Sequence, residues 1–220
     1  ILNSASISSS STAPVVVEEA KKVLVTLADG TTNTITDKTR QSVDDEDFSS
    51  AVYSKADLVF NGSGTINVNA GYRNGIKSTD DLKVVSGTFN ITSNEDGIIG
   101  KDLLGIKDGK FTIKSGSDGM KSTYDTDTSK GNIVITGGEF DITASNDGVH
   151  CNRDILISGG NLTISSGDDG VHADDNLQVD GGTIDIKKCC EGLEGVQITL
   201  NDGDISIVAS DDGIKAADGS

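Results

Sequence analysis

An acidic residue stands immediately before a glycine at regular intervals along most of the chain. This row of acids comprises Asp96, Asp118, Asp147, Asp169, Glu191 and Asp212. If the repeating units stack, neighbouring carboxylates lie about 4.8 Å apart, and each pair repels by roughly 1 kcal/mol in water or about 3.5 kcal/mol at an effective dielectric constant of about 20. Calcium takes about six to eight oxygen ligands, so the row predicts calcium ions between the units.

Doubled acids strengthen the prediction at two of these positions. Asp168 precedes Asp169, and Asp211 precedes Asp212. Asp174 follows the first pair and would lie across the same corner. Turn chemistry explains one acid in each unit but not two, so we expect these extra carboxylates to contribute to a metal site.

Turn chemistry is the alternative explanation for the row as a whole. An aspartate before glycine is typical of a tight corner, in which the side chain bonds local amides and the glycine takes a positive φ. Basic side chains shortly after the acids would then supply the countercharge: Lys77, Lys121, His150, His172 and Lys215. The sequence leaves both explanations open.

A second candidate calcium site lies in an insertion between two of the repeats. Asp125, Asp127 and Ser129 alternate with other residues and precede Gly131, which resembles the start of a calcium-binding loop. The glycine comes one place later than in an EF-hand, and no glutamate closes the loop. A solvated polar loop is the alternative interpretation.

The two histidines, His150 and His172, occupy equivalent positions in successive units. We expect both to face outward. Zinc would require a third and a fourth nitrogen or sulfur ligand nearby, and Cys151 should point inward by strand alternation. The sequence therefore favours contact with a bound ligand, or plain exposure, over zinc coordination.

The glycines that follow the acids mark a repeat that decides the architecture. They lie 21 or 22 residues apart, except for one interval of 29 residues: Gly75, Gly97, Gly119, Gly148, Gly170, Gly192 and Gly213. A second turn signal, such as Gly159-Gly160, divides each unit, and apolar residues alternate with polar ones between the turns. Three short strands in each unit match one coil of a parallel β-helix.

Stacked coils also predict which side chains meet in the interior. One apolar column should contain Ile66, Phe89, Phe111, Phe140, Leu162, Ile184 and Ile205. Another should contain Ile76, Ile98, Met120, Val149, Val171, Leu193 and Ile214. We predict an all-β fold, a parallel β-helix of about nine coils, in a single domain over residues 1–220, with irregular coils in 1–63 and regular coils in 64–220.

Composition excludes several classes of partner. The net charge of −17 disfavours nucleic acid and anionic membranes, since both require basic patches. The chain has no apolar run long enough to span a bilayer. Its three cysteines do not indicate a disulfide framework, so we expect free thiols. Cations are the natural partners of such a chain.

Several blocks of the sequence, taken in order, carry a resemblance to a known family: Leu27–Asp37, Tyr53–Leu58, Asp118–Ser122, Glu191–Gly195 and Ala209–Ile214. Over nearly its whole length the chain resembles bacterial carbohydrate-binding domain-containing proteins of plant-cell-wall-degrading anaerobes. The resemblance implies a right-handed, single-stranded parallel β-helix similar to polysaccharide lyases. It also implies an extracellular or cell-surface protein that binds calcium and plant cell-wall polysaccharides, notably polygalacturonate, and cellulose.

Aromatic side chains that could stack on a flat cellulose surface are scarce, because the chain has no tryptophan and three tyrosines. We therefore expect an acidic sugar to be held through calcium and basic side chains. The residues expected to contact the sugar are Lys121, Arg153, His150, His172, Tyr124 and Lys215. No catalytic residue is predicted.

Two other functions remain open at this point. A calcium-dependent pectate lyase would abstract the proton beside a uronate carboxylate, with Lys121 or Arg153 as the base. A purely structural solenoid would use its acids only to stay soluble.

Overall fold

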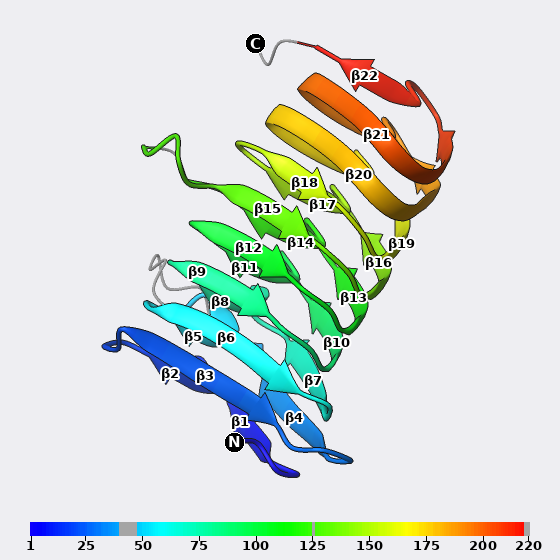
Figure 1. Cartoon of the computed structure of the whole chain (residues 1–220). Helices are drawn as coiled ribbons and strands as arrows, with labels where there is room; N and C mark the ends of the chain where they lie inside the picture. Colours follow the sequence, from blue (N-terminus) through cyan, green and yellow to red (C-terminus); the bar gives the residue numbers. More distant parts are fainter. Residues whose placement is uncertain (40–47, 125, 218–220) are drawn as a thin grey trace.

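The computed structural model describes residues 1–39, 48–124 and 126–217. These residues form strands and turns, with no helix among them. The strands pair in parallel as one 22-stranded sheet that winds into a solenoid with three faces (Figure 1). The predicted fold class, an all-β parallel β-helix, is confirmed.

Every coil contributes one strand to each face, and each strand pairs with its counterpart one coil away. The first face contains β1 (Ser6–Ser9), β4 (Thr32–Asp37), β7 (Thr65–Ala70), β10 (Thr88–Ser93), β13 (Lys110–Ser115), β16 (Glu139–Ala144) and β19 (Asn161–Ser165).

The second face carries the row of acids at its entrance. It contains β2 (Val15–Val17), β5 (Ser50–Ser54), β8 (Asn74–Ser78), β11 (Ile98–Gly100), β14 (Met120–Ser122), β17 (Val149–Cys151) and β22 (Ile214–Ala216).

The third face completes each coil. It contains β3 (Lys22–Leu27), β6 (Asp57–Gly62), β9 (Asp81–Val84), β12 (Leu103–Ile106), β15 (Asn132–Ile135) and β18 (Ile155–Ile157).

Two long strands continue around the corners instead of stopping at them. β20 (Val171–Cys189) pairs with β17, β18 and β19 in turn, so it passes through all three faces. β21 (Leu193–Ala209) follows the same course beside it, and both appear as curved ribbons in yellow and orange in Figure 1. The register shifts at the corners, where extra residues make the bend.

Both predicted apolar columns are confirmed by the strand registers. In the first column the rings of Phe89, Phe111 and Phe140 stack in parallel, with centroid separations of 5.0 and 4.8 Å. Their spacing equals the distance between adjacent strands, because each ring projects from the same position of successive coils. The core is therefore a row of thin layers, and it needs few bulky residues.

The structure also bears on the cysteines and on membrane-spanning segments. All three cysteines are free thiols, and Cys151 is buried in the core as strand alternation predicted. Among the described residues there is no helix long and apolar enough to cross a membrane.

Candidate functional site

The acids stack one above another at the corner that leads into the second face, and the carboxylates of Asp96, Asp118 and Asp147 each cap the coil beside them. Asp118 N–H donates to Asp96 Oδ1 at 3.0 Å, and Asp147 N–H donates to Asp118 Oδ1 at 3.2 Å. Asp169 N–H donates to Asp147 Oδ1 at 2.9 Å. Asn74 plays the same part for Asp96 at 3.0 Å. One oxygen of each side chain is thus committed to the fold.

From Gly97 to Gly192, the glycine after each acid is required by close approach and not by its φ angle. A Cβ on Gly119 would lie 2.5 Å from both Gly148 O and Ile142 Cγ2. The expectation that these glycines take a positive φ is wrong, because the positive angles occur at the other turn, as in Gly109 and Gly138. The bonding partner was also misplaced: the acid caps the next coil and not its own turn.

The second oxygen of the acids faces basic side chains from the outer column of the same face. Lys121 Nζ lies 2.6 Å from Asp118 Oδ2 and 3.7 Å from Asp96 Oδ2. Burial works against the charge of Asp118, but the nearby His150, whose Nδ1 lies 3.5 Å from Oδ2, and hydrogen bonds from Lys121 and Asn146 outweigh it and hold the pKa well below the usual range. Burial likewise opposes the charge of Lys121, but the neighbouring carboxylates outweigh it and raise the pKa. Lys121 is therefore protonated, which is unsuited to a base that must abstract a proton.

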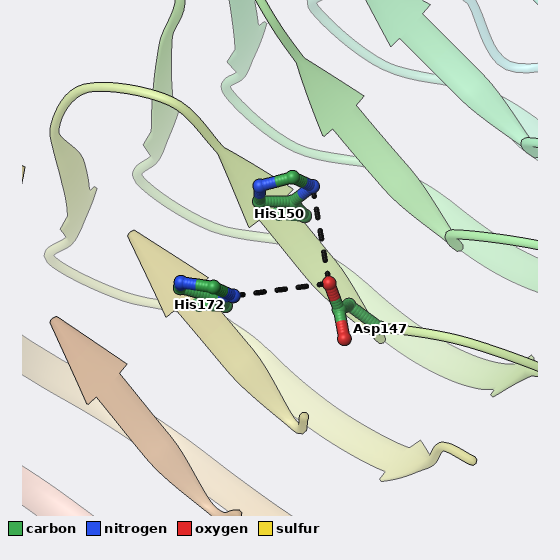
Figure 2. A group of neighbouring side chains, drawn as sticks. All are labelled: Asp147, His150 and His172. Atoms are coloured by element: carbon green, nitrogen blue, oxygen red, sulfur yellow. Dashed lines mark ion pairs between the residues drawn. The ribbon is translucent and has the colours of Figure 1, made fainter. Parts of the chain in front are cut away.

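The two histidines lie in register on β17 and β20, with ring centroids 5.1 Å apart. Their Nδ1 atoms face Asp147 Oδ2 at 3.8 Å for His150 and 3.9 Å for His172 (Figure 2). Their Nε2 atoms face Asp174 Oδ1 at 3.4 and 3.5 Å. His172 Nδ1 also lies 3.2 Å from Asp169 Oδ2, and this hydrogen-bonded partner raises the pKa of His172 to about 9. The imidazoles are half-buried between carboxylates and are not plainly exposed.

Lys215 closes the same outer column in the later coils. Its Nζ lies 3.2 Å from Glu191 Oε1 and 2.9 Å from Glu194 Oε1. The predicted contact residue is therefore engaged by two carboxylates of the preceding coil. Glu194 was not among the predicted site residues, although it occupies the same position as His172 one coil later.

Of the doubled acids, Asp169 is buried in the row, whereas the other three are exposed. Asp168 is exposed, and its carboxylate lies near Cys190 and Glu191, with the three ligand atoms within 4.8 Å of one another. Asp211 and Asp212 are both exposed. The structure thus brings Asp168 into a small group of possible ligands. Among the described residues, Asp211 and Asp212 belong to no such group.

The insertion before β15 uses its polar groups locally. Asp127 Oδ1 accepts hydrogen bonds from the backbone N–H and the hydroxyl of Ser129, at 3.0 and 2.7 Å. The ring of Tyr124 lies beneath two ammonium groups, with Lys130 Nζ at 4.7 Å and Lys101 Nζ at 5.4 Å from its centroid. Cation–π contacts therefore hold the insertion against the solenoid.

Two predicted site residues remain, Arg153 and Asp125. Arg153 Nη1 lies 3.5 Å from Asp175 Oδ2, after β17 and away from the buried row. Asp125, the first acid of the predicted calcium loop, lies outside the described residues.

A second acid cluster, which the sequence reasoning missed, lies at the corner between the second and third faces. The carboxylate oxygens of Asp57, Asp80 and Asp81 all lie within 4.8 Å of one another. Asp102 is buried beside them, with Oδ2 2.5 Å from Lys130 Nζ and with Oδ1 lacking a hydrogen-bond partner. Burial raises the pKa of Asp80, and the neighbouring Asp102 raises it further. The sequence does contain a signal for this cluster: two adjacent acids, Asp80 and Asp81, are followed by Asp102 one repeat after Asp80.

A hollow of about 550 Å³ lies on the second face, beside the start of the row of acids. Four basic residues line it: Arg73, Lys77, Lys101 and Lys121. Two acids, Glu95 and Asp96, also reach it, and Arg73 Nε bonds Glu95 Oε1 at 3.1 Å. The hollow is thus richer in basic than in acidic groups, although the chain as a whole carries a net charge of −17. Of its lining residues, the sequence reasoning had assigned only Lys121 to ligand contact and Asp96 to metal.

The sequence and the structure of this chain are both similar to those of known proteins. A protein from Acetivibrio thermocellus described as a carbohydrate-binding domain-containing protein is 32% identical over 94 residues, which is 41% of this chain and 33% of that protein. The chain therefore spans about a third of the length of that relative.

The solved structure of a polysaccharide lyase-like protein from C. thermocellum, a gadolinium derivative, superposes with a TM-score of 0.78 and 30% identity. The superposition covers 81% of this chain and 73% of that one. The sequence profile of the carbohydrate-binding domain-containing proteins matches residues 1–219. The chain belongs to that family, and its fold is that of a polysaccharide lyase-like protein.

Proposed function

We propose that this protein binds acidic plant cell-wall polysaccharides, such as polygalacturonate, in the basic hollow of the second face. The observation that carries the proposal is the gathering of four basic side chains around a 550 Å³ hollow in a strongly acidic chain. Arginine and lysine are the side chains that pair with carboxylates, and arginine can do so with two parallel hydrogen bonds. An acidic polymer would otherwise be repelled by this protein.

The shape of the hollow suits a chain of sugars. Its basic and hydroxyl groups come from successive coils: Lys77 and Thr79 from one, Lys101 from the next, and Lys121 and Thr123 from the one after. A linear polymer also presents identical groups at a constant interval, so adjacent coils can bind adjacent sugars. Cellulose is the poorer ligand, because the chain offers no tryptophan and few tyrosines for stacking.

Calcium belongs to this proposal, but at the corner cluster and not in the row of acids. In Asp96, Asp118 and Asp147, one oxygen accepts a backbone N–H and the other faces lysine or histidine, so few oxygens remain for an ion that needs about six to eight. At the corner, Asp57, Asp80 and Asp81 gather oxygens, and buried Asp102, whose Oδ1 is unpartnered, lies next to Asp80. The related structure is a gadolinium derivative, and gadolinium, like calcium, is a hard cation that takes oxygen ligands.

Location outside the cell is part of the same proposal. Plant cell-wall polymers are too large to enter a bacterial cell, so a protein that binds them acts in the medium or on the cell surface. Secretion can be tested by fractionating a culture of the producing organism and probing each fraction with an antibody to this chain.

Calorimetric titration with oligogalacturonate tests the sugar site. We expect the doubly substituted Arg73→Ala/Lys101→Ala variant to bind about tenfold more weakly or worse, since each charged contact contributes roughly 1 kcal/mol or more. Lys110→Ala is the matched control, because Lys110 is an exposed lysine on the first face. Equal affinity for neutral cello-oligosaccharides, or binding that the double variant does not weaken, would contradict the proposal.

Thermal unfolding with and without a chelator tests the calcium site. Calcium should raise the Tm of the wild type, and Asp80→Asn should remove that rise, whereas the exposed first-face variant Asp141→Asn should keep it. A Tm that calcium does not change would remove the ion from the proposal.

An absorbance assay for unsaturated sugars separates binding from lyase activity. The protonated state of Lys121 argues against its use as a base, so we expect no product. Release of unsaturated product that depends on calcium would instead make the chain a polysaccharide lyase.

A further inference from the structure

We propose that Asp147, His150 and His172 bind one divalent transition-metal ion, such as Zn²⁺, Ni²⁺ or Co²⁺, at a site separate from the sugar hollow and the calcium cluster. The ligand atoms are Asp147 Oδ2 and the Nδ1 atoms of the two imidazoles (Figure 2). All three atoms lie within 4.8 Å of one another. Two nitrogens and one carboxylate oxygen are a ligand set that suits transition metals, whereas calcium takes oxygen.

The distances require only small side-chain adjustments. The two nitrogen-to-oxygen separations are 3.8 and 3.9 Å. Ligand atoms about 2.0–2.1 Å from a tetrahedral ion lie roughly 3.4 Å apart, so each imidazole needs to move by a few tenths of an ångström. Further positions on the ion can be filled by water or by the carboxylates of Asp118 and Asp169, which lie 3.5 and 3.2 Å from His150 and His172 Nδ1.

The three ligands are held in place before any metal arrives. His150 and His172 are paired in register on adjacent strands, and their rings stack. Asp147 is buried, and its Oδ1 accepts the backbone N–H of Asp169, which directs Oδ2 toward the imidazoles. A preorganised site of this kind loses little conformational freedom when it binds an ion.

Unpartnered polar atoms provide an independent observation. His150 Nδ1 is buried and has no hydrogen-bond partner. Asp169 is buried too, and its Oδ1 also lacks a partner, although its other oxygen faces His172. Buried polar groups without partners are rare and costly, and a coordinated ion would satisfy the nitrogen directly.

Asp174 supplies the outer support that metal-bound histidines usually have. Its Oδ1 lies 3.4 Å from His150 Nε2 and 3.5 Å from His172 Nε2, on the side of the rings away from Asp147. Once an ion displaces the proton of Nδ1, an Nε2–H that points to a carboxylate holds the tautomer in which Nδ1 carries the lone pair. One carboxylate thus orients both imidazoles for the same ion.

Titration of the whole chain with Co²⁺ at about pH 8, followed by visible absorption, tests the site, because the metal must displace protons from the imidazoles and alkaline pH favours that exchange. Cys190→Ser serves as the background, since Cys190 lies in a different group of possible ligands. The chain has two histidines, so every imidazole signal comes from this pair. We expect one equivalent of Co²⁺ to bind, an excess of Ca²⁺ not to displace it, and His150→Ala and His172→Ala each to weaken it by about tenfold or more.

Binding that both histidine variants retain, or no binding to the Cys190→Ser background, would overturn the proposal. If a histidine variant does not fold, as judged by circular dichroism, the Cys190→Ser protein itself gives the answer by NMR. Zinc should shift the ring signals of both histidines, and unchanged ring signals would refute the site. Neither result depends on whether the sugar hollow or the calcium cluster functions as proposed.

Discussion

At the scale of single residues, the buried acids divide two tasks between two oxygens. Asp118 is fully buried, yet its Oδ1 accepts from Asp147 N–H and from Asn146 Nδ2, and its Oδ2 pairs with Lys121. The first task fixes one coil against the next, and the second neutralises charge. Asn74 performs the first task with an amide, which shows that capping does not require a charge.

Replacing Asp118 separates the two tasks. We expect Asp118→Ala to lower the free energy of unfolding by about 3 kcal/mol, because it leaves a buried N–H and the ammonium of Lys121 without their acceptor. Asp118→Asn keeps the acceptor for the N–H and should cost roughly half as much. Urea unfolding measures both. Equal losses in the two variants would show that capping contributes nothing.

The thiols should differ sharply in reactivity. Burial raises the pKa of Cys151 to about 12, whereas Cys190 is only half-buried, although Glu191 raises the pKa of its thiol as well. Since only the thiolate reacts, iodoacetamide at about pH 8 should label Cys190 first and leave Cys151 intact until the chain is unfolded. Mass spectrometry of the digested protein identifies the labelled residue. Early labelling of Cys151 would mean that this coil opens readily.

At the scale of elements, the distance between coils is set at the acid–glycine corners. At each corner, two backbone N–H groups donate to carbonyl oxygens of the next coil. For example, Gly148 N–H donates to Asp169 O and Val149 N–H donates to Gly170 O. A Cβ on Gly148 would lie 2.6 Å from Gly170 O and 2.4 Å from Ile164 Cγ2. No side chain can be inserted there without separating the coils.

Alanine at the corner should therefore cost far more than alanine in a strand. Gly148→Ala should lower the free energy of unfolding by about 2–3 kcal/mol, because the clash involves backbone as well as a packed isoleucine. Gly105→Ala is the control, since its Cβ would meet only Lys83 Cγ at an ordinary 3.4 Å, and we expect a change within about 0.5 kcal/mol. A harmless Gly148→Ala would mean that the coils can move apart at this corner.

At the scale of the whole molecule, a net charge of −17 is distributed over a solenoid whose buried acids have their ion pairs on the second face. Excess like charge destabilises a compact state through self-repulsion. Lys121 and the two histidines lie beside the buried acids, where a positive charge relieves the largest local cost. The other acids keep the protein soluble but repel one another.

Salt should therefore stabilise the protein. Raising NaCl from low to physiological ionic strength shortens the screening length to about 8 Å, and we expect the Tm to rise by roughly 2–4 °C. The Tm should be measured in the presence of a chelator, so that trace divalent ions do not contribute. KCl should have the same effect as NaCl. A Tm that falls with salt would show that the ion pairs of the second face outweigh the repulsion elsewhere.

The sequence alone determined the architecture, because in a parallel β-helix a constant interval along the chain becomes a constant neighbour in space. That relation is why the column through Phe89, Phe111 and Phe140 and the row through Asp118 and Asp147 could both be read from their spacing. Only the tertiary structure decided what those acids touch.

The reason is that a repeat fixes where a side chain starts but not where its atoms end. The side-chain rotamer of Asp118 determines which carboxylate oxygen accepts a backbone N–H and which faces Lys121. The bends between faces carried Asp174 to both imidazoles and brought Asp102 beside Asp80. The two-residue alternation stops at the corners, so which side chains meet there is decided only when the coil is closed.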